Sequence, residues 1–175
     1  MKGQRTGNRE QRTGLVVLGL MLVLGAWAGA VAQGISFGDA PAAKKGHVVL
    51  LSDGVDVAAG KVQWVELRFR VDPGFHINSH APKDPLLIGT ALKLDTGHGV
   101  DVQGMDYPKG AAFQLGQGKD AQMLDVYQGE FRMRVRLIAD PGNTTMSGTL
   151  RYQACDDAAC FPPKNLDVKV AVNSK

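Results

Sequence analysis

Strict alternation of apolar and polar residues most constrains what this chain can fold into. Between positions 64 and 71, Val65, Leu67, Phe69 and Val71 alternate with polar or amphipathic residues. A period of two places successive side chains on opposite faces of a β-strand, so this segment is predicted to be half-buried. The same pattern marks further segments at 75–80, 92–94, 131–137, 150–155 and 166–172. No segment after residue 32 shows a sustained helical period.

Turn signals separate these segments and indicate how the strands connect. Asp72-Pro73-Gly74 and Asp140-Pro141-Gly142-Asn143 each follow an alternating run. Several short strands with regular turns predict an all-β fold, an antiparallel immunoglobulin-like β-sandwich. Such a sheet keeps one face in water, and the row Arg132, Arg134, Arg136 is interpreted as that wet face. The alternative is a surface for an acidic protein partner.

The N-terminus has the features of an export signal. Residues 1–32 combine a basic start, an apolar run from Leu15 to Leu24, and the small-residue sequence Ala30-Val31-Ala32. This order predicts a signal peptide cleaved after residue 32, and hence an exported protein. The alternative is an uncleaved anchor that holds the exported domain at the membrane. We expect a flexible lead-in at 33–46 and one domain at 47–173.

The net charge argues against a nucleic-acid partner once the signal is set aside. The chain has 20 Lys and Arg against 17 Asp and Glu, and four of the former and one of the latter lie in residues 1–32. The remainder therefore has 16 of each and a formal net charge of zero. No basic patch indicates binding to nucleic acid.

Cys155 and Cys160 are the only cysteines, and their spacing limits how they can bond. In an oxidising compartment, two thiols this close are expected to form a disulfide. On an α-helix, residues five apart point about 140° away from each other. The pair is therefore predicted to lie on a turn or across a hairpin, and Pro162-Pro163 bars a helix beyond it. Alternation places Cys155 on the polar side of its strand, with both cysteines at one rim of the sandwich.

Two functions are open for such a disulfide. It could exchange with other thiols, or it could be a structural bond in a non-catalytic binding module. Closing so short a loop lowers the entropy of the unfolded chain and stabilises the fold by only about 2 kcal/mol. A domain of this size does not need that stabilisation to fold. The carboxylates of Asp156 and Asp157 disfavour a thiolate beside them, so the oxidised pair is expected to act as the electrophile. They also repel an incoming thiolate, which favours attack at Cys160.

Three motifs resemble the N-terminal domain of the thiol:disulfide interchange protein DsbD, a family of immunoglobulin-like periplasmic domains. The most specific is Tyr152-Gln153-Ala154-Cys155 followed by Cys160-Phe161-Pro162-Pro163. The others are the runs at 71–79, Val-Asp-Pro-Gly-Phe-His-Ile-Asn-Ser, and at 125–129, Asp-Val-Tyr-Gln-Gly. The similarity extends from about His47 to Val172.

The resemblance implies a function and a pair of site residues. Cys155 and Cys160 would be the exchanging cysteines of a protein-disulfide reductase component, with Cys160 forming the mixed disulfides. The domain would accept electrons from a thioredoxin-like partner and pass them to exported disulfide proteins, without a cofactor. Full-length family members continue into a membrane electron carrier and a thioredoxin domain, and the sequence to Lys175 holds neither. The electrons are therefore expected to come from another chain.

The same resemblance implies an aromatic loop that caps the disulfide. The corresponding stretch, 116–123, contains no aromatic residue, and Phe113, Met123 and Tyr107 are the candidates to replace it. His76 and His80 lie on the same face of a predicted strand, where two metal ligands could lie. Without a nearby carboxylate they make a poor site, so we expect no metal and interpret both as a polar face or turn brace.

Overall fold

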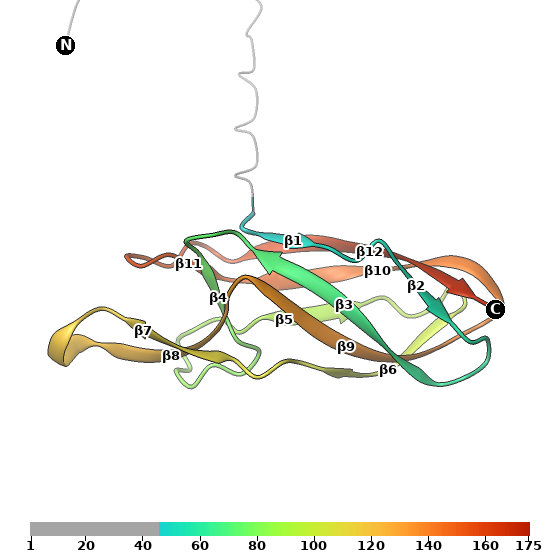
Figure 1. The fold of residues 1–175 in the computed structure, drawn as a ribbon, viewed down its shortest axis with the longest axis horizontal. Coiled ribbons are helices and arrows are strands. Elements are labelled where there is room, and N and C mark those ends of the chain that lie inside the picture. The colour runs from blue at the N-terminus through green and yellow to red at the C-terminus, as the bar shows by residue number, and fades with distance from the viewer. Residues whose placement is uncertain (1–45) are drawn as a thin grey trace, which may run out of the picture. The chain divides into compact units, whose positions relative to one another are not determined.

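The computed structural model describes residues 46–175, which form twelve β-strands and one short 3₁₀ helix, with no α-helix among them (Figure 1). The predicted signal at 1–32 and, apart from Gly46, the predicted lead-in at 33–46 lie outside the described residues. No helix in residues 46–175 is long and apolar enough to cross a membrane. The elements are β1 (Val48–Leu50), β2 (Gly54–Val57), β3 (Gln63–Val71), β4 (His76–Asn78), β5 (Ala91–Leu94), β6 (Val100–Asp106), β7 (Ala111–Leu115), η1 (Gly118–Asp120), β8 (Gln122–Tyr127), β9 (Glu130–Ala139), β10 (Gly142–Tyr152), β11 (Ala154–Cys155) and β12 (Lys164–Ser174).

The strands form three four-stranded sheets. The first has the order β1-β3-β9-β6, the second β2-β12-β10-β5, and the third β11-β4-β8-β7. Neighbouring strands are antiparallel except β2 and β12, which are parallel. The buried side chains of the first two sheets belong to one hydrophobic cluster, so these sheets are the two layers of the sandwich. The predicted all-β, immunoglobulin-like fold is confirmed.

Alternation along β3 explains why the layers pack as they do. Val65, Leu67, Phe69 and Val71 are buried, and the residues between them are exposed or half-exposed. Leu67 pairs with Met133 of β9, and neither side chain is exposed to solvent. Removing such side chains from water contributes roughly 1.5–3 kcal/mol each. The wet-face interpretation of Arg132, Arg134 and Arg136 agrees with their exposure on β9.

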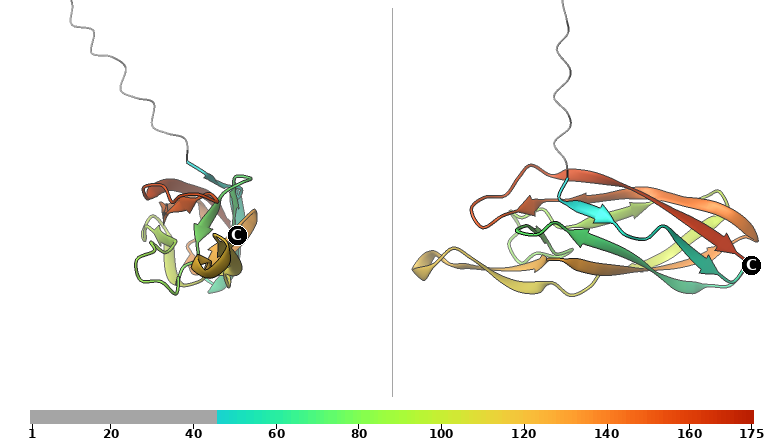
Figure 2. Two further views of the ribbon diagram at one scale, coloured as in Figure 1. Left: turned by 90° about the vertical axis from the view of Figure 1, so that its left-hand side faces the viewer. Right: turned by 45° about the horizontal axis from the view of Figure 1, so that its top comes forward.

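The third sheet is a continuation of the first two at one end of the sandwich. β3 leads into β4 through a turn in which the Phe75 amide bonds to the Asp72 carbonyl at 3.2 Å. Pro73 and Gly74 occupy the middle of this turn, and the positive φ of 80° at Gly74 suits glycine. β8 leads into β9 through Gly129, also at positive φ. Figure 2 shows the β7–β8 hairpin projecting beyond the two layers at this end.

Two segments that were predicted to be half-buried differ in the structure. β4 is only three residues long, and all of them are buried because strands pair on both sides and both faces are covered. The run at 150–155 is also interrupted, because β10 ends at Tyr152 and β11 starts at Ala154 in a different sheet. Gln153 therefore marks the point where the chain crosses between sheets.

Candidate redox site

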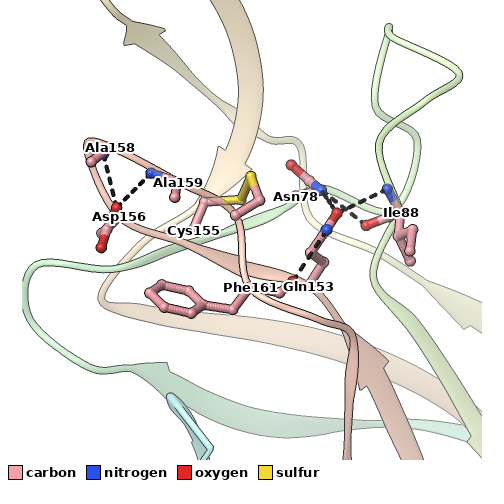
Figure 3. The surroundings of a disulfide bond; sticks show 9 residues. Asn78, Ile88, Gln153, Cys155, Asp156, Ala158, Ala159 and Phe161 are labelled. Atoms are coloured by element: carbon pink, nitrogen blue, oxygen red, sulfur yellow. Dashed lines mark hydrogen bonds between the residues drawn. A yellow bond between two sulfur atoms is a disulfide. The ribbon is translucent and has the colours of Figure 1, made fainter.

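Cys155 and Cys160 are joined by a disulfide across a tight hairpin at the end of β11 (Figure 3). The two residues face each other as an antiparallel bridge, with their Cα atoms 3.9 Å apart. The amide of Phe161 donates to the carbonyl of Ala154 at 2.8 Å on one side of this pair. On the other side the amide of Asp156 donates to the carbonyl of Ala159 at 3.0 Å. Of the two arrangements that the spacing allows, a turn or a hairpin, the structure has the hairpin.

The two sulfur-bearing residues differ in exposure. Cys155 is 0% exposed, whereas Cys160 is exposed. The prediction that Cys155 lies on the polar side of its strand is wrong. The chain passes from β10 to β11, in a different sheet, at Gln153, so the alternation along β10 does not continue to Cys155. A nucleophile from outside can therefore approach the bond from the Cys160 side.

The Asp156 carboxylate closes the hairpin. Its Oδ1 accepts hydrogen bonds from the amides of Ala158 and Ala159, at 2.8 and 2.7 Å. These two bonds lower the pKa of Asp156 below its usual value, so the group stays charged at neutral pH. The negative charge expected beside the cysteines is thus held in place by the turn itself.

Gln153 ties the disulfide hairpin to the rest of the fold, as Figure 3 shows. Its Nε2 donates to the Phe161 carbonyl at 3.2 Å. Its Oε1 accepts from Asn78 Nδ2 and from the Ile88 amide, both at 3.3 Å. One side chain therefore joins both arms of the hairpin to β4 and to the loop before β5. Sequence reasoning did not single out Gln153 by itself.

His76 occupies the position on β4 that pairs with Cys155. It is only 1% exposed, and its Nε2 is buried without a hydrogen-bond partner. Burial lowers the pKa of His76, and the charges of Asp157 and Asp156 partly oppose this shift. The sequence interpretation of His76 as a polar face or turn brace missed this position beside the cysteines, which depends on the pairing of β4 with β11.

The three residues that were candidates to replace the aromatic cap over the disulfide have different surroundings. The Phe113 ring packs against His76, with ring centroids 4.2 Å apart. Tyr107 stacks instead on His80 at 3.6 Å, and Met123 is 58% exposed. Of the three, Phe113 is therefore the one that covers the residue paired with Cys155.

His76 and His80 have separate ring contacts, His76 with Phe113 and His80 with Tyr107. His80 is exposed, and its Nδ1 lies 2.9 Å from the Thr90 carbonyl oxygen. Within residues 46–175, no three His, Cys, Asp or Glu side chains gather in a way that could hold a metal ion.

An apolar surface adjoins the hairpin on the side away from β4. Phe161 lies in a cluster with Phe75 and His47, whose rings stack at 3.7 Å. A groove of about 770 Å³ runs beside it, lined by β1, the start of β12 and the segment from Phe161 to Pro163. The groove therefore begins at Phe161, the residue that follows Cys160 in the chain.

Together these features define a class: an immunoglobulin-like β-sandwich with an accessible short-loop disulfide at one rim. Residues 51–171 match the family described as "Thiol:disulfide interchange protein DsbD, N-terminal". The chain belongs to this family, and the predicted resemblance is confirmed. The membership places it among thiol–disulfide interchange proteins.

Solved structures with a similar chain course include two periplasmic or redox domains. The reduced DsbD N-terminal domain of Neisseria meningitidis is 18% identical, with a TM-score of 0.41, and the match covers 62% of this chain and 76% of that one. The N-terminal periplasmic domain of ScsB from Proteus mirabilis is 15% identical, with a TM-score of 0.47 and coverage of 70% and 43%. The chain thus spans less than half of that ScsB chain. No curated protein sequence matches the chain significantly.

Proposed function

We propose that this protein carries out thiol–disulfide exchange in the periplasm through Cys155 and Cys160. It takes reducing equivalents from a thioredoxin-like donor and passes them to exported disulfide proteins. The observation that carries this proposal is the unequal exposure of the two cysteines, 0% for Cys155 against an exposed Cys160. Exchange needs an attacking thiolate to reach one sulfur, with the other sulfur leaving.

The reaction proceeds in two displacements. A donor thiolate attacks Sγ of Cys160, forming a mixed disulfide while the bond to Cys155 breaks and its electron pair stays on Cys155. The donor's second thiolate then attacks the donor sulfur that is bonded to Cys160. This breaks the mixed disulfide, and Cys160 leaves as a thiolate. The donor dithiol becomes a disulfide, and Cys155 and Cys160 become a dithiol after taking up two protons from solvent. Transfer to an exported disulfide protein runs the same steps in reverse.

The surroundings of the cysteines support this sequence of steps. The charge of Asp156 lies on the turn beside Cys155, and this turn holds it ionised. The apolar segment Phe161-Pro162-Pro163 follows Cys160 and provides a surface where the donor could dock. Sulfur chemistry of this kind uses no cofactor. We further propose that residues 47–173 act as one exported domain and that residues 1–32 direct its export.

Reduction of the folded protein tests this function. Reduced thioredoxin is added to the oxidised protein, and free thiols and circular dichroism are followed together. We expect the bond to open readily while the β-rich spectrum persists, because the short loop contributes only about 2 kcal/mol of a typical 5–15 kcal/mol. The double variant Cys155→Ala/Cys160→Ala serves as a control for the fold without the bond. A bond that resists reduction until the protein unfolds would instead support a structural disulfide in a binding module.

A further inference from the structure

The pairing of β4 with β11 places His76 directly opposite Cys155. Directly paired residues in an antiparallel sheet project from the same face, with Cβ atoms about 4.5–5.5 Å apart. An imidazole ring and a cysteine sulfur at that separation are within reach of each other. His76 and the exposed residue Cys160 therefore lie on opposite sides of the buried Cys155.

His76 is a buried polar group whose hydrogen-bonding capacity is not fully used. The side chain is 1% exposed, and Nε2 has no partner. Most buried polar atoms in native folds have a hydrogen-bond partner, so an unpaired one calls for an explanation. The Phe113 ring packs on the imidazole and keeps water from that side.

The charges around His76 come from the disulfide hairpin. Asp157 and Asp156 favour its protonated form, but burial outweighs them and lowers its pKa. β7 contributes the uncharged ring of Phe113, and the β8 residue opposite Ile77 is Tyr127, whose hydroxyl is bonded to the His80 amide and the Pro108 carbonyl. In the oxidised protein His76 is consequently neutral at neutral pH.

We infer that His76 stabilises the thiolate that forms on Cys155 when the disulfide is opened at Cys160, by hydrogen bonding to that sulfur from its ring N–H. This inference rests on the proposed exchange through Cys155 and Cys160. The disulfide bond breaks, its electron pair moves onto Sγ of Cys155, and the imidazole N–H donates to the new charge. A proton from solvent then neutralises the pair, residing on His76 or on Cys155. Without His76, the leaving group of this displacement would be an unpaired, buried thiolate on Cys155, close to two carboxylates. Burial and the like charges both disfavour such a thiolate.

Ionisation of Cys155 in a single-cysteine protein tests this role without requiring exchange. In Cys160→Ala the thiolate of Cys155 is titrated by its ultraviolet absorbance, with and without the further change His76→Gln. We expect His76→Gln to raise the pKa of Cys155 by about one unit, a tenfold change in its ionisation constant. The matched control is His80→Gln in the same background, because His80 is an exposed histidine with separate contacts, and it should leave the titration unchanged. An unchanged Cys155 titration in folded His76→Gln would overturn the inference.

The two proposals fail in distinguishable ways. If His76→Gln shifts the Cys155 titration but thioredoxin does not reduce the folded protein, then the exchange function is wrong and the His76–Cys155 coupling stands. If thioredoxin reduces the wild type and the titration does not shift, only the role of His76 is wrong.

A measurement on the wild type covers the case in which His76→Gln does not fold. The imidazole resonances of His76 are titrated by NMR in the oxidised and in the reduced protein. We expect the His76 signals of the reduced protein to show an additional shift at the pH where Cys155 ionises, which the oxidised protein lacks. Identical His76 titrations in the two states would contradict the inference.

Discussion

Cys155 is fully buried while Cys160, to which it is bonded, is exposed. Cys155 is the last residue of β11 and pairs with His76 of β4, whereas Cys160 lies on the returning arm of the hairpin. The disulfide thus joins a buried residue to an exposed one, and the proposed exchange begins at the exposed residue, Cys160.

This asymmetry predicts which single-cysteine variant captures partners. Cys155→Ala should accumulate mixed disulfides with thioredoxin-like proteins through Cys160, and Cys160→Ala should accumulate few. Replacing Asp156 and Asp157 together by Asn should narrow the difference, since both repel an incoming thiolate. Non-reducing electrophoresis after trapping in the periplasm measures the adducts. Equal adducts at both sulfurs, or none, would count against the mechanism.

Removing the Gln153 side chain should destabilise the hairpin. Gln153→Ala takes away three hydrogen bonds, to Phe161, Asn78 and Ile88, and leaves partly buried groups unpaired. We expect a loss of about 1–3 kcal/mol in the free energy of unfolding, measured by denaturant titration. The control is Gln114→Ala, an exposed glutamine with one local bond, which should lose much less. Equal losses for the two variants would refute the bridging role of Gln153.

The core of the sandwich predicts a larger effect at Leu67. This side chain is completely buried against β9, and Leu67→Ala should lower the free energy of unfolding by about 2–5 kcal/mol. Arg68→Ala, on the exposed face of the same strand, should change it by no more than about 0.5 kcal/mol. The two free energies of unfolding are compared by urea titration, under the condition that the dependence of the free energy on urea concentration is the same for both variants. A loss at Arg68 as large as that at Leu67 would mean that the faces of β3 are misassigned.

The lowered pKa of His76 predicts a pH dependence of stability. The unfolded chain binds a proton at His76 near its usual value of about 6.5, whereas the oxidised folded protein does so only at lower pH. The unfolded state therefore holds more protons in that interval, and stability falls as pH drops below about 6.5. His76→Gln should remove part of this fall, measured as the free energy of unfolding at about pH 7.5 and about pH 5.5. His80→Gln should keep the wild-type dependence, and a steeper fall in His76→Gln would reverse the assigned sign.

Much of the fold could be predicted because alternation is a local property. The buried faces of β3 and β9 follow directly from residues 64–71 and 131–137, since each strand has one dry and one wet face. β1, β2, β6, β7 and β8 were not predicted, because their segments are short or half-exposed and show little alternation. The choice between a turn and a hairpin at the cysteines also followed from local geometry, because a five-residue separation excludes a disulfide along a helix.

The sequence by itself therefore determined the alternating strands such as β3 and β9, the turn chemistry, and a turn or hairpin at Cys155 and Cys160. Only the tertiary structure decided that Cys155 is buried and that His76 lies opposite it. Both depend on Gln153, where the chain leaves the sheet of β10 for the sheet of β4 and the alternation starts anew. The physical reason is that strand pairing between distant segments is set by packing and register across the whole domain, which no local pattern records.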